Sequence, residues 1–111
     1  MLEEFRLQVK KHWDALKGPP LRATLKRVET EDEILIPPLY KAGLDVVTTE
    51  YLASFTIWGS GEVQVIIMSQ ETAQEIVIDD RKLSHPEEIG DLLTYYFQAL
   101  EPGRELKKYP S

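Results

Sequence analysis

Apolar and polar residues alternate through residues 51–79, a period of two that turns successive side chains to opposite faces of a strand. The sequence Gly59-Ser60-Gly61 and the polar residues 69–73 interrupt this alternation, and glycine readily adopts the positive φ that tight turns need. The pattern predicts a three-stranded antiparallel meander with strands at residues 51–58, 62–69 and 74–79. Its core face is expected to consist of Phe55, Ile57, Val63, Val65, Ile67, Ile76 and Ile78.

Amphipathic helices are predicted before and after the meander. Within residues 2–17, apolar side chains recur every three or four positions and share one helix face: Leu2, Phe5, Val9, Trp13 and Leu16. A second stripe, within residues 85–101, contains Ile89, Leu92, Leu93, Tyr96 and Leu100. Ser84 and Glu87 have the spacing of a capping box, in which each side chain bonds the other's backbone N–H, so Ser84 is expected to start this helix.

Two further strands are expected at residues 21–28 and 44–48. A break or bulge at residues 48–50 is expected before the meander, and the alternative is one long bent strand that continues through residues 51–58. Pro37-Pro38 removes two backbone donors, so residues 37–43 are interpreted as a loop along a sheet edge. Residues 104–111 form a polar tail. The predicted fold is a single α+β domain, a two-layer sandwich in which an antiparallel sheet of four or five strands packs against N-terminal and C-terminal helices.

The chain has 111 residues and no Cys. This length suits one domain that is stabilised by packing alone, and the lack of Cys favours a reducing compartment. The first residues have mixed charge without the apolar centre of a signal peptide, and no stretch approaches the roughly 18 apolar residues of a membrane span. We therefore expect a cytoplasmic protein that does not bind membranes.

Charge is distributed unevenly around the net value of −6. Residues 1–28 hold seven basic and three acidic side chains, whereas residues 29–101 hold three basic and fifteen acidic ones. An acidic field repels nucleic-acid phosphates and steers basic protein partners, so no nucleic-acid ligand is expected. The alternative is that the acidic surface only maintains solubility.

Candidate catalytic and metal-binding groups are sparse. The two histidines, His12 and His85, belong to different predicted helices. Neighbouring carboxylates such as Asp79-Asp80 fall in predicted turns, whereas acid–base catalysis by two carboxylates places them across a cleft. Gly59-Ser60-Gly61 lacks the flanking residues of a nucleophile elbow. The sequence predicts no catalytic residue, no metal and no cofactor, and hence a non-enzymatic protein.

The second face of the meander is the candidate partner-binding site. The alternation places Trp58, Ile66, Met68 and Val77 there as an apolar group, beside the polar residues Thr56, Glu62, Gln64 and Glu75. An exposed apolar group with a polar rim marks an interaction surface, and the acidic residues Glu29, Glu31, Asp32 and Glu33 are expected to assist by steering a basic partner. The alternative is that a helix covers this face and makes it a second core.

The segment from Ala53 to Leu100 resembles the TriTu group of immunity proteins from bacterial polymorphic toxin systems. The shared features are a strand ending in Ile57-Trp58, a glycine-containing turn, an alternating strand, a Glu71-Thr72 turn and a helix with a Ser-x-x-Glu cap. Ala73 stands where a glycine is expected after Thr72. The resemblance implies a small non-enzymatic antidote that binds and blocks a cognate toxin domain.

Two other functions remain as alternatives. One is a small-molecule-binding or enzymatic domain with a pocket between helix and sheet, lined by Tyr51, His85, Tyr95 and Tyr96. The other is a structural subunit that pairs sheet edges or apolar faces into a homodimer.

Overall fold

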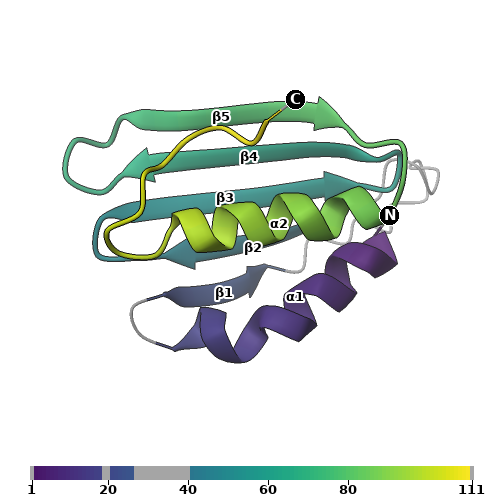
Figure 1. The fold of residues 1–111 in the computed structure, drawn as a ribbon, viewed down its shortest axis with the longest axis horizontal. Helices are drawn as coiled ribbons and strands as arrows, with labels where there is room; N and C mark the ends of the chain where they lie inside the picture. Colours follow the sequence, from purple (N-terminus) through teal and green to yellow (C-terminus); the bar gives the residue numbers. More distant parts are fainter. Residues whose placement is uncertain (1, 19–20, 27–40, 111) are drawn as a thin grey trace.

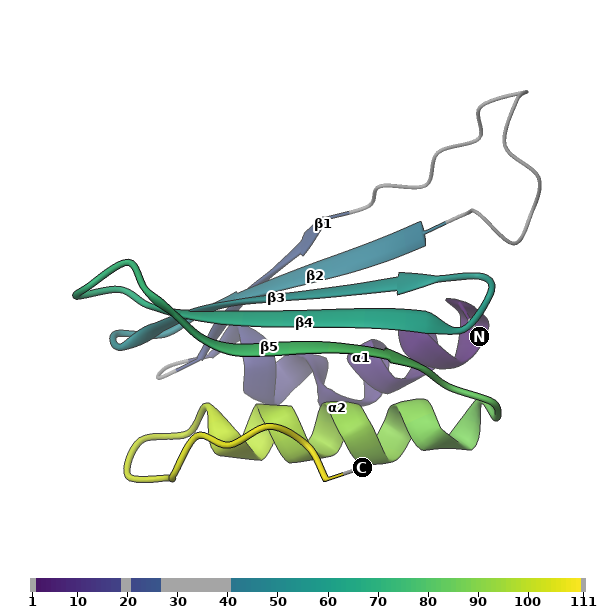
Figure 2. The ribbon, with the colours of Figure 1, turned by 90° about the horizontal axis from the view of Figure 1, so that it is seen from above.

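The computed structural model describes residues 2–18, 21–26 and 41–110, together with the side chains of these residues except 24–26. The elements along the chain are α1 (Leu2–Lys17), β1 (Arg22–Lys26), β2 (Lys41–Val47), β3 (Tyr51–Trp58), β4 (Glu62–Ser69), β5 (Glu75–Lys82) and α2 (Glu87–Ala99). The strands form one antiparallel sheet in the order β1-β2-β3-β4-β5, so each strand pairs with its neighbour in sequence. Both helices lie on the same face of the sheet (Figures 1 and 2). This arrangement confirms the predicted α+β sandwich.

The second strand begins earlier than expected, at Lys41, inside the segment interpreted as a loop. The predicted break before β3 is confirmed. The Thr48 N–H donates to the carbonyl of Tyr51 (2.8 Å), and the Thr48 hydroxyl accepts from the Tyr51 N–H (2.8 Å). These paired bonds close the turn between β2 and β3. Residues 27–40, including the Pro37-Pro38 loop, lie outside the described residues.

The pairing of β3 with β4 follows the predicted register. Phe55 pairs with Val65 and Ile57 with Val63, and these side chains face the helices. Gly61 adopts φ 96°, and its N–H donates to the carbonyl of Trp58 at 3.0 Å. The turn at residues 59–61 therefore uses glycine where a side chain would be strained.

The faces of β5 are the reverse of the prediction. Ile76 and Ile78 are each 48% exposed on the outer face, whereas Val77 (5%) and Asp79 (0%) face the helices. The reason is a register irregularity where Ile67 pairs with Val77 but Met68 pairs with Glu75, because one extra residue reverses the faces of a strand. The strand also continues to Lys82, through residues that the sequence pattern assigned to a polar connection.

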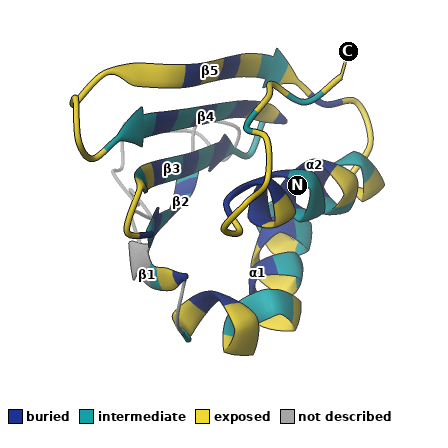
Figure 3. Cartoon of the chain, turned by 60° about the vertical axis from the view of Figure 1, so that its left-hand side comes forward, coloured by how far each residue is buried: buried dark blue, intermediate teal, exposed yellow. Residues whose placement is uncertain are grey.

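The core lies between the inner face of the sheet and the two helices (Figure 3). Its buried helix residues are Phe5, Val9 and Leu16 of α1 and Ile89, Leu92, Leu93, Tyr96 and Phe97 of α2. Phe55 at the centre of β3 meets the rings of Tyr96 and Phe97 edge to face, with centroids 6.2 and 5.5 Å apart. Aromatic edge contacts of this kind add to the free energy gained from burial.

The start of α2 differs from the predicted capping box. No side-chain cap is present at its N-cap residue, Pro86. Instead the carboxylate of Glu88, not Glu87, accepts hydrogen bonds from the N–H groups of Ser84 (2.9 Å) and His85 (3.1 Å). These bonds, led by the one from His85, hold the pKa of Glu88 below its ordinary value. Helix α2 begins at Glu87, three residues after Ser84 and therefore later than predicted. The carboxylate that reaches back to the turn before the helix is accordingly that of Glu88 and not that of Glu87.

Candidate functional site

The outer face of the sheet is the side that neither helix covers. Figure 2 shows α1 and α2 together beneath the sheet, with no described helix on its other side. The side chains on this upper side are partly or fully exposed, in contrast to the buried residues that alternate with them. The alternative that a helix buries this face as a second core does not hold for α1 and α2.

Aliphatic side chains gather at one end of the outer face. We call this group the outer apolar cluster: Val47, Leu52, Ile66, Met68, Ile76 and Ile78. Strand pairing sets Leu52 between Val47 and Met68 in one row, and Ile66 beside Ile78 in the next row. Leu52 is 39% exposed, and Ile76 and Ile78 are more exposed still, so the cluster presents contiguous apolar surface to solvent. Exposed apolar surface of this kind marks interaction sites.

Trp58 lies toward the opposite end of the same face. Trp58 pairs with Lys41. It also lines an open hollow of about 480 Å³, whose polar lining residues include Glu62, Gln64, Asp80 and Lys82. Thr56 and Gln64 pair in the row between Trp58 and the row of Ile66. The sheet therefore brings Trp58, Glu62, Ile66 and Met68 onto one face, but Trp58 stands apart from the aliphatic residues.

The residues on the outer face differ from those that the sequence predicts. Val77 is absent from it, because it belongs to the core, and Ile76 and Ile78 take its place. Leu52 was omitted, although its position between Tyr51 and Ala53 in an alternating strand indicates the outer face. Glu75, opposite Met68, is exposed at the start of β5. The expected steering residues Glu29, Glu31, Asp32 and Glu33 lie outside the described residues.

Charges of both signs surround the apolar cluster. Among the strand side chains that the structure describes, those on the outer face include the basic residues Arg22, Lys41 and Lys82 and the acidic residues Asp45, Glu62, Glu75 and Asp80. Three cations beside four carboxylates make this face nearly neutral. An acidic character that steers a basic partner would therefore come from residues 29–33 and from other surfaces.

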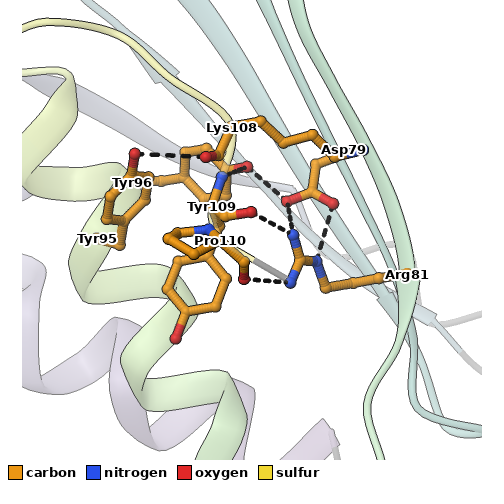
Figure 4. Close-up of polar contacts among 7 residues, drawn as sticks. All are labelled: Asp79, Arg81, Tyr95, Tyr96, Lys108, Tyr109 and Pro110. Atoms are coloured by element: carbon orange, nitrogen blue, oxygen red, sulfur yellow. Dashed lines mark hydrogen bonds and ion pairs between the residues drawn. The ribbon is translucent and has the colours of Figure 1, made fainter.

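A buried polar group joins β5 to α2 on the inner side of the sheet, and the sequence pattern did not indicate it (Figure 4). The carboxylate of Asp79 is 0% exposed and accepts two hydrogen bonds from the guanidinium of Arg81, at 2.9 and 3.0 Å. It also accepts one from the hydroxyl of Tyr96, at 2.5 Å. Burial, followed by the bond to Asp79, raises the pKa of Tyr96. Three charge-assisted bonds compensate the loss of hydration of this carboxylate.

The four residues proposed for a small-molecule pocket do not share one cavity. Tyr96 is enclosed in the core, and His85 is exposed before α2. Tyr51 lines a hollow of about 40 Å³ beside Leu100, whereas Tyr95 lines a groove between α1 and α2. In the part of the chain that the structure describes, these four side chains therefore do not converge on one site.

Among residues 2–18, 21–26 and 41–110, no group of three or more acidic, His or Cys side chains is arranged to hold a metal ion. Neither described helix is long and apolar enough to cross a membrane. A comparison with protein-family models finds none that matches this chain, and a comparison with curated proteins finds no match either.

Proposed function

We propose that the chain is a protein-binding antidote, an immunity protein that neutralises a toxin domain by covering it with the outer face of its sheet. The observation that carries the proposal is the outer apolar cluster, which includes three of the four large hydrophobic residues that are most exposed in the described chain. The resemblance of residues 53–100 to TriTu immunity proteins supports the same function.

Occlusion of a partner by this face requires a rigid surface rather than a catalytic cleft. The outer apolar cluster lies on hydrogen-bonded strands whose opposite face is packed in the core, so its residues are held in fixed rows. Aliphatic residues that are already ordered lose little conformational entropy on binding. In this mechanism Leu52 and Ile78 supply apolar contact area, and Trp58 supplies an aromatic anchor at the edge of the contact.

The experiment pairs the chain with the product of the neighbouring gene, which the proposal expects to carry a toxic C-terminal domain. The chain should co-purify with that domain and protect cells that express it. Substituting Leu52→Asp and Ile78→Asp together should weaken the complex at least about thirtyfold, since central anchors contribute about 2 kcal/mol or more. The unfolding temperature should change little, because both side chains are already in contact with water.

The matched control is Leu7→Asp. Leu7 is the fourth large exposed hydrophobic residue, 57% exposed on α1 and remote from the outer face, so its substitution should leave binding unchanged. Equal binding by the double variant and the Leu7 variant would contradict the proposed surface. A neighbouring gene without a toxic domain would contradict the immunity function.

Self-association through the same face is the competing explanation of the apolar cluster. Light scattering of the purified chain separates the two functions. A stable dimer that Leu52→Asp with Ile78→Asp dissociates would favour the structural subunit over the antidote.

A further inference from the structure

Residues 104–110, which we call the strap, follow α2 and run back between that helix and β5 (Figures 1 and 4). The strap has no regular secondary structure. The hydrogen bonds that the structure gives to the main chain of residues 105–110 all go to side chains. Tyr109 donates its N–H to the hydroxyl of Tyr96 at 2.9 Å. Arg81 donates to the carbonyls of Tyr109 (2.7 Å) and Pro110 (3.1 Å).

Tyr95 completes the set of groups that hold the strap main chain. Its hydroxyl lies 3.1 Å from the carbonyl of Lys107 and 3.5 Å from that of Lys108. We call Asp79, Arg81, Tyr95 and Tyr96 the cradle. Docking of an extended segment against aromatic side chains, here Tyr95 and Tyr96, is one of the ways in which domains recognise peptides.

Only two strap side chains pack against the body of the protein. Leu106 and Tyr109 are partly buried against the core, whereas the other strap side chains are exposed. The ring of Tyr109 meets Tyr95 edge to face with centroids 5.2 Å apart, and the guanidinium of Arg81 lies 5.0 Å from its centroid. Edge-to-face and cation–π contacts are specific for an aromatic ring at this position.

Three of the four cradle residues, Asp79, Arg81 and Tyr96, are bonded to one another independently of the strap. Asp79 fixes Arg81 by two bonds and Tyr96 by one, and all three residues belong to β5 or α2. Arg81 and Tyr96 would keep these partners if the strap left, so little ordering entropy opposes rebinding. The connection to α2 also permits departure, because residues 101–103 are exposed and Gly103, at φ +78°, is surrounded by open space.

We propose that the cradle is a peptide-binding site for an extended segment with an apolar residue followed three positions later by tyrosine. In this structure the chain's own strap occupies it, with Tyr109 against Tyr95 and Arg81 and with Leu106 packed against the adjoining core. The strap of a second copy of this chain, which carries the same two residues, takes its place when the chain's own strap is released. This site lies on the helix side of the sheet and is separate from the outer face.

The test uses a chain shortened by residues 104–111 and a fluorescent peptide of residues 104–110, acetylated and amidated so that its ends resemble an internal segment. The shortened chain should bind the peptide saturably, as measured by anisotropy. The intact chain should bind it at least about tenfold more weakly, because a tethered strap competes at an effective concentration in the millimolar range.

Peptide variants test the recognised pattern without altering the protein. Replacing the tyrosine (Tyr109→Ala) should weaken binding at least about tenfold, because it removes the aromatic contacts at the site. The matched Lys107→Ala peptide should bind within about twofold of the parent, since that side chain is exposed. Equal affinities of the two variant peptides would overturn the proposal.

Two further results would also overturn it. One is the absence of saturable binding to the folded shortened chain at up to about 1 mM peptide. The other is equal binding to the intact and shortened chains, which would place the peptide elsewhere. If the shortened chain does not fold, a full-length Leu106→Ala, Tyr109→Ala variant replaces it, with the same expected gain in affinity over the parent chain.

The source of the competing segment follows from size-exclusion chromatography of the intact chain. A dimer that disappears in the shortened chain identifies the segment as the strap of a second copy, exchanged reciprocally. An intact chain that stays monomeric at millimolar concentration would overturn the second copy as the source of the segment.

Discussion

Substituting Tyr96→Phe removes a single oxygen atom from the buried polar group. That oxygen donates to the carboxylate of Asp79 and accepts from the N–H of Tyr109. The ring itself stays, together with its edge contact to Phe55. The substitution therefore isolates the contribution of the two hydrogen bonds from that of aromatic packing.

The expected loss is about 2–3 kcal/mol. A hydrogen bond to a charged group contributes about 1.5–3 kcal/mol and a neutral one about 1 kcal/mol. The second bond contributes less here, because Tyr109 is only partly buried and water can replace the lost acceptor. Asp79 remains paired with Arg81, which keeps the loss below that of an isolated buried charge. For a domain of this size, the change corresponds to a fall in unfolding temperature of about 10 °C.

Urea unfolding followed by tryptophan fluorescence measures the change at constant m-value. Tyr95→Phe is the matched control. It removes a neighbouring hydroxyl whose bonds to the strap lie in exposed surroundings, so it should lower the unfolding free energy by no more than about 0.5 kcal/mol. A Tyr96→Phe variant within about 0.5 kcal/mol of the parent would refute this account of the buried polar group.

Alkaline pH provides an independent reading of the same hydroxyl. The pKa of Tyr96 in the folded chain is raised above its ordinary value of 10.0, so the unfolded chain ionises first. The stability that Tyr96 contributes is complete below 10.0 and is lost as pH rises toward the folded pKa. The gap between parent and Tyr96→Phe should therefore narrow by about 1.4 kcal/mol per pH unit above about 10. A constant gap would contradict the raised pKa.

Three further predictions concern the turn before β5, the cap of α2 and the register of β5. Ala73 has φ 56°, a conformation that disfavours a Cβ, so Ala73→Gly should raise the unfolding free energy by about 0.5–1 kcal/mol in urea denaturation; a loss would contradict the strain. The pKa of Glu88 is below its ordinary value of 4.5, so the stability that its carboxylate contributes is complete above pH 4.5 and is lost as pH falls through the folded pKa. In melting curves recorded across this pH range, Glu88→Gln should lack this fall in stability and otherwise follow the parent. Val77→Asp should unfold the domain or lower its stability by about 3 kcal/mol or more, whereas Ile78→Asp should change it by less than about 1 kcal/mol; the reverse order by circular dichroism would contradict the assigned faces.

Element type and most of the core could be predicted from the sequence because period-two and helical patterns depend on local burial. The register of β3 and β4 was also predictable, since residues 59–61 leave one short loop that aligns Phe55 with Val65. The register of β5 was not predictable in this way. An alternation such as Ile76-Val77-Ile78 is apolar on both faces, so only the turn geometry decides which face is buried, and a single extra residue reverses it.

The candidate sites depended on that register. Ile76 and Ile78 joined the outer face only because β5 shifted, and the same shift turned Asp79 inward. A carboxylate at a core-facing position reads as a surface residue in a hydrophobicity pattern, because the pattern does not show which groups bond to it. Arg81 is two residues from Asp79 and Tyr96 lies on α2, while the main chain of Tyr109 bonds Arg81 and Tyr96. Side-chain networks of this kind become visible only when the tertiary structure assembles them.

The position of Asp79 also has a bearing on how the protein behaves at high concentration. Strand β5 lies at the margin of the sheet, where unpaired backbone groups invite a strand from a neighbouring molecule. A strand added beside β5 would extend the sheet, and its core-facing side chains would lie next to Asp79 and Arg81. These charged groups do not offer the hydrocarbon surface that apolar side chains pack against. The ion pair of Asp79 and Arg81 thereby discourages fibril-like growth from this margin, in a chain whose opposite sheet surface is rich in aliphatic residues.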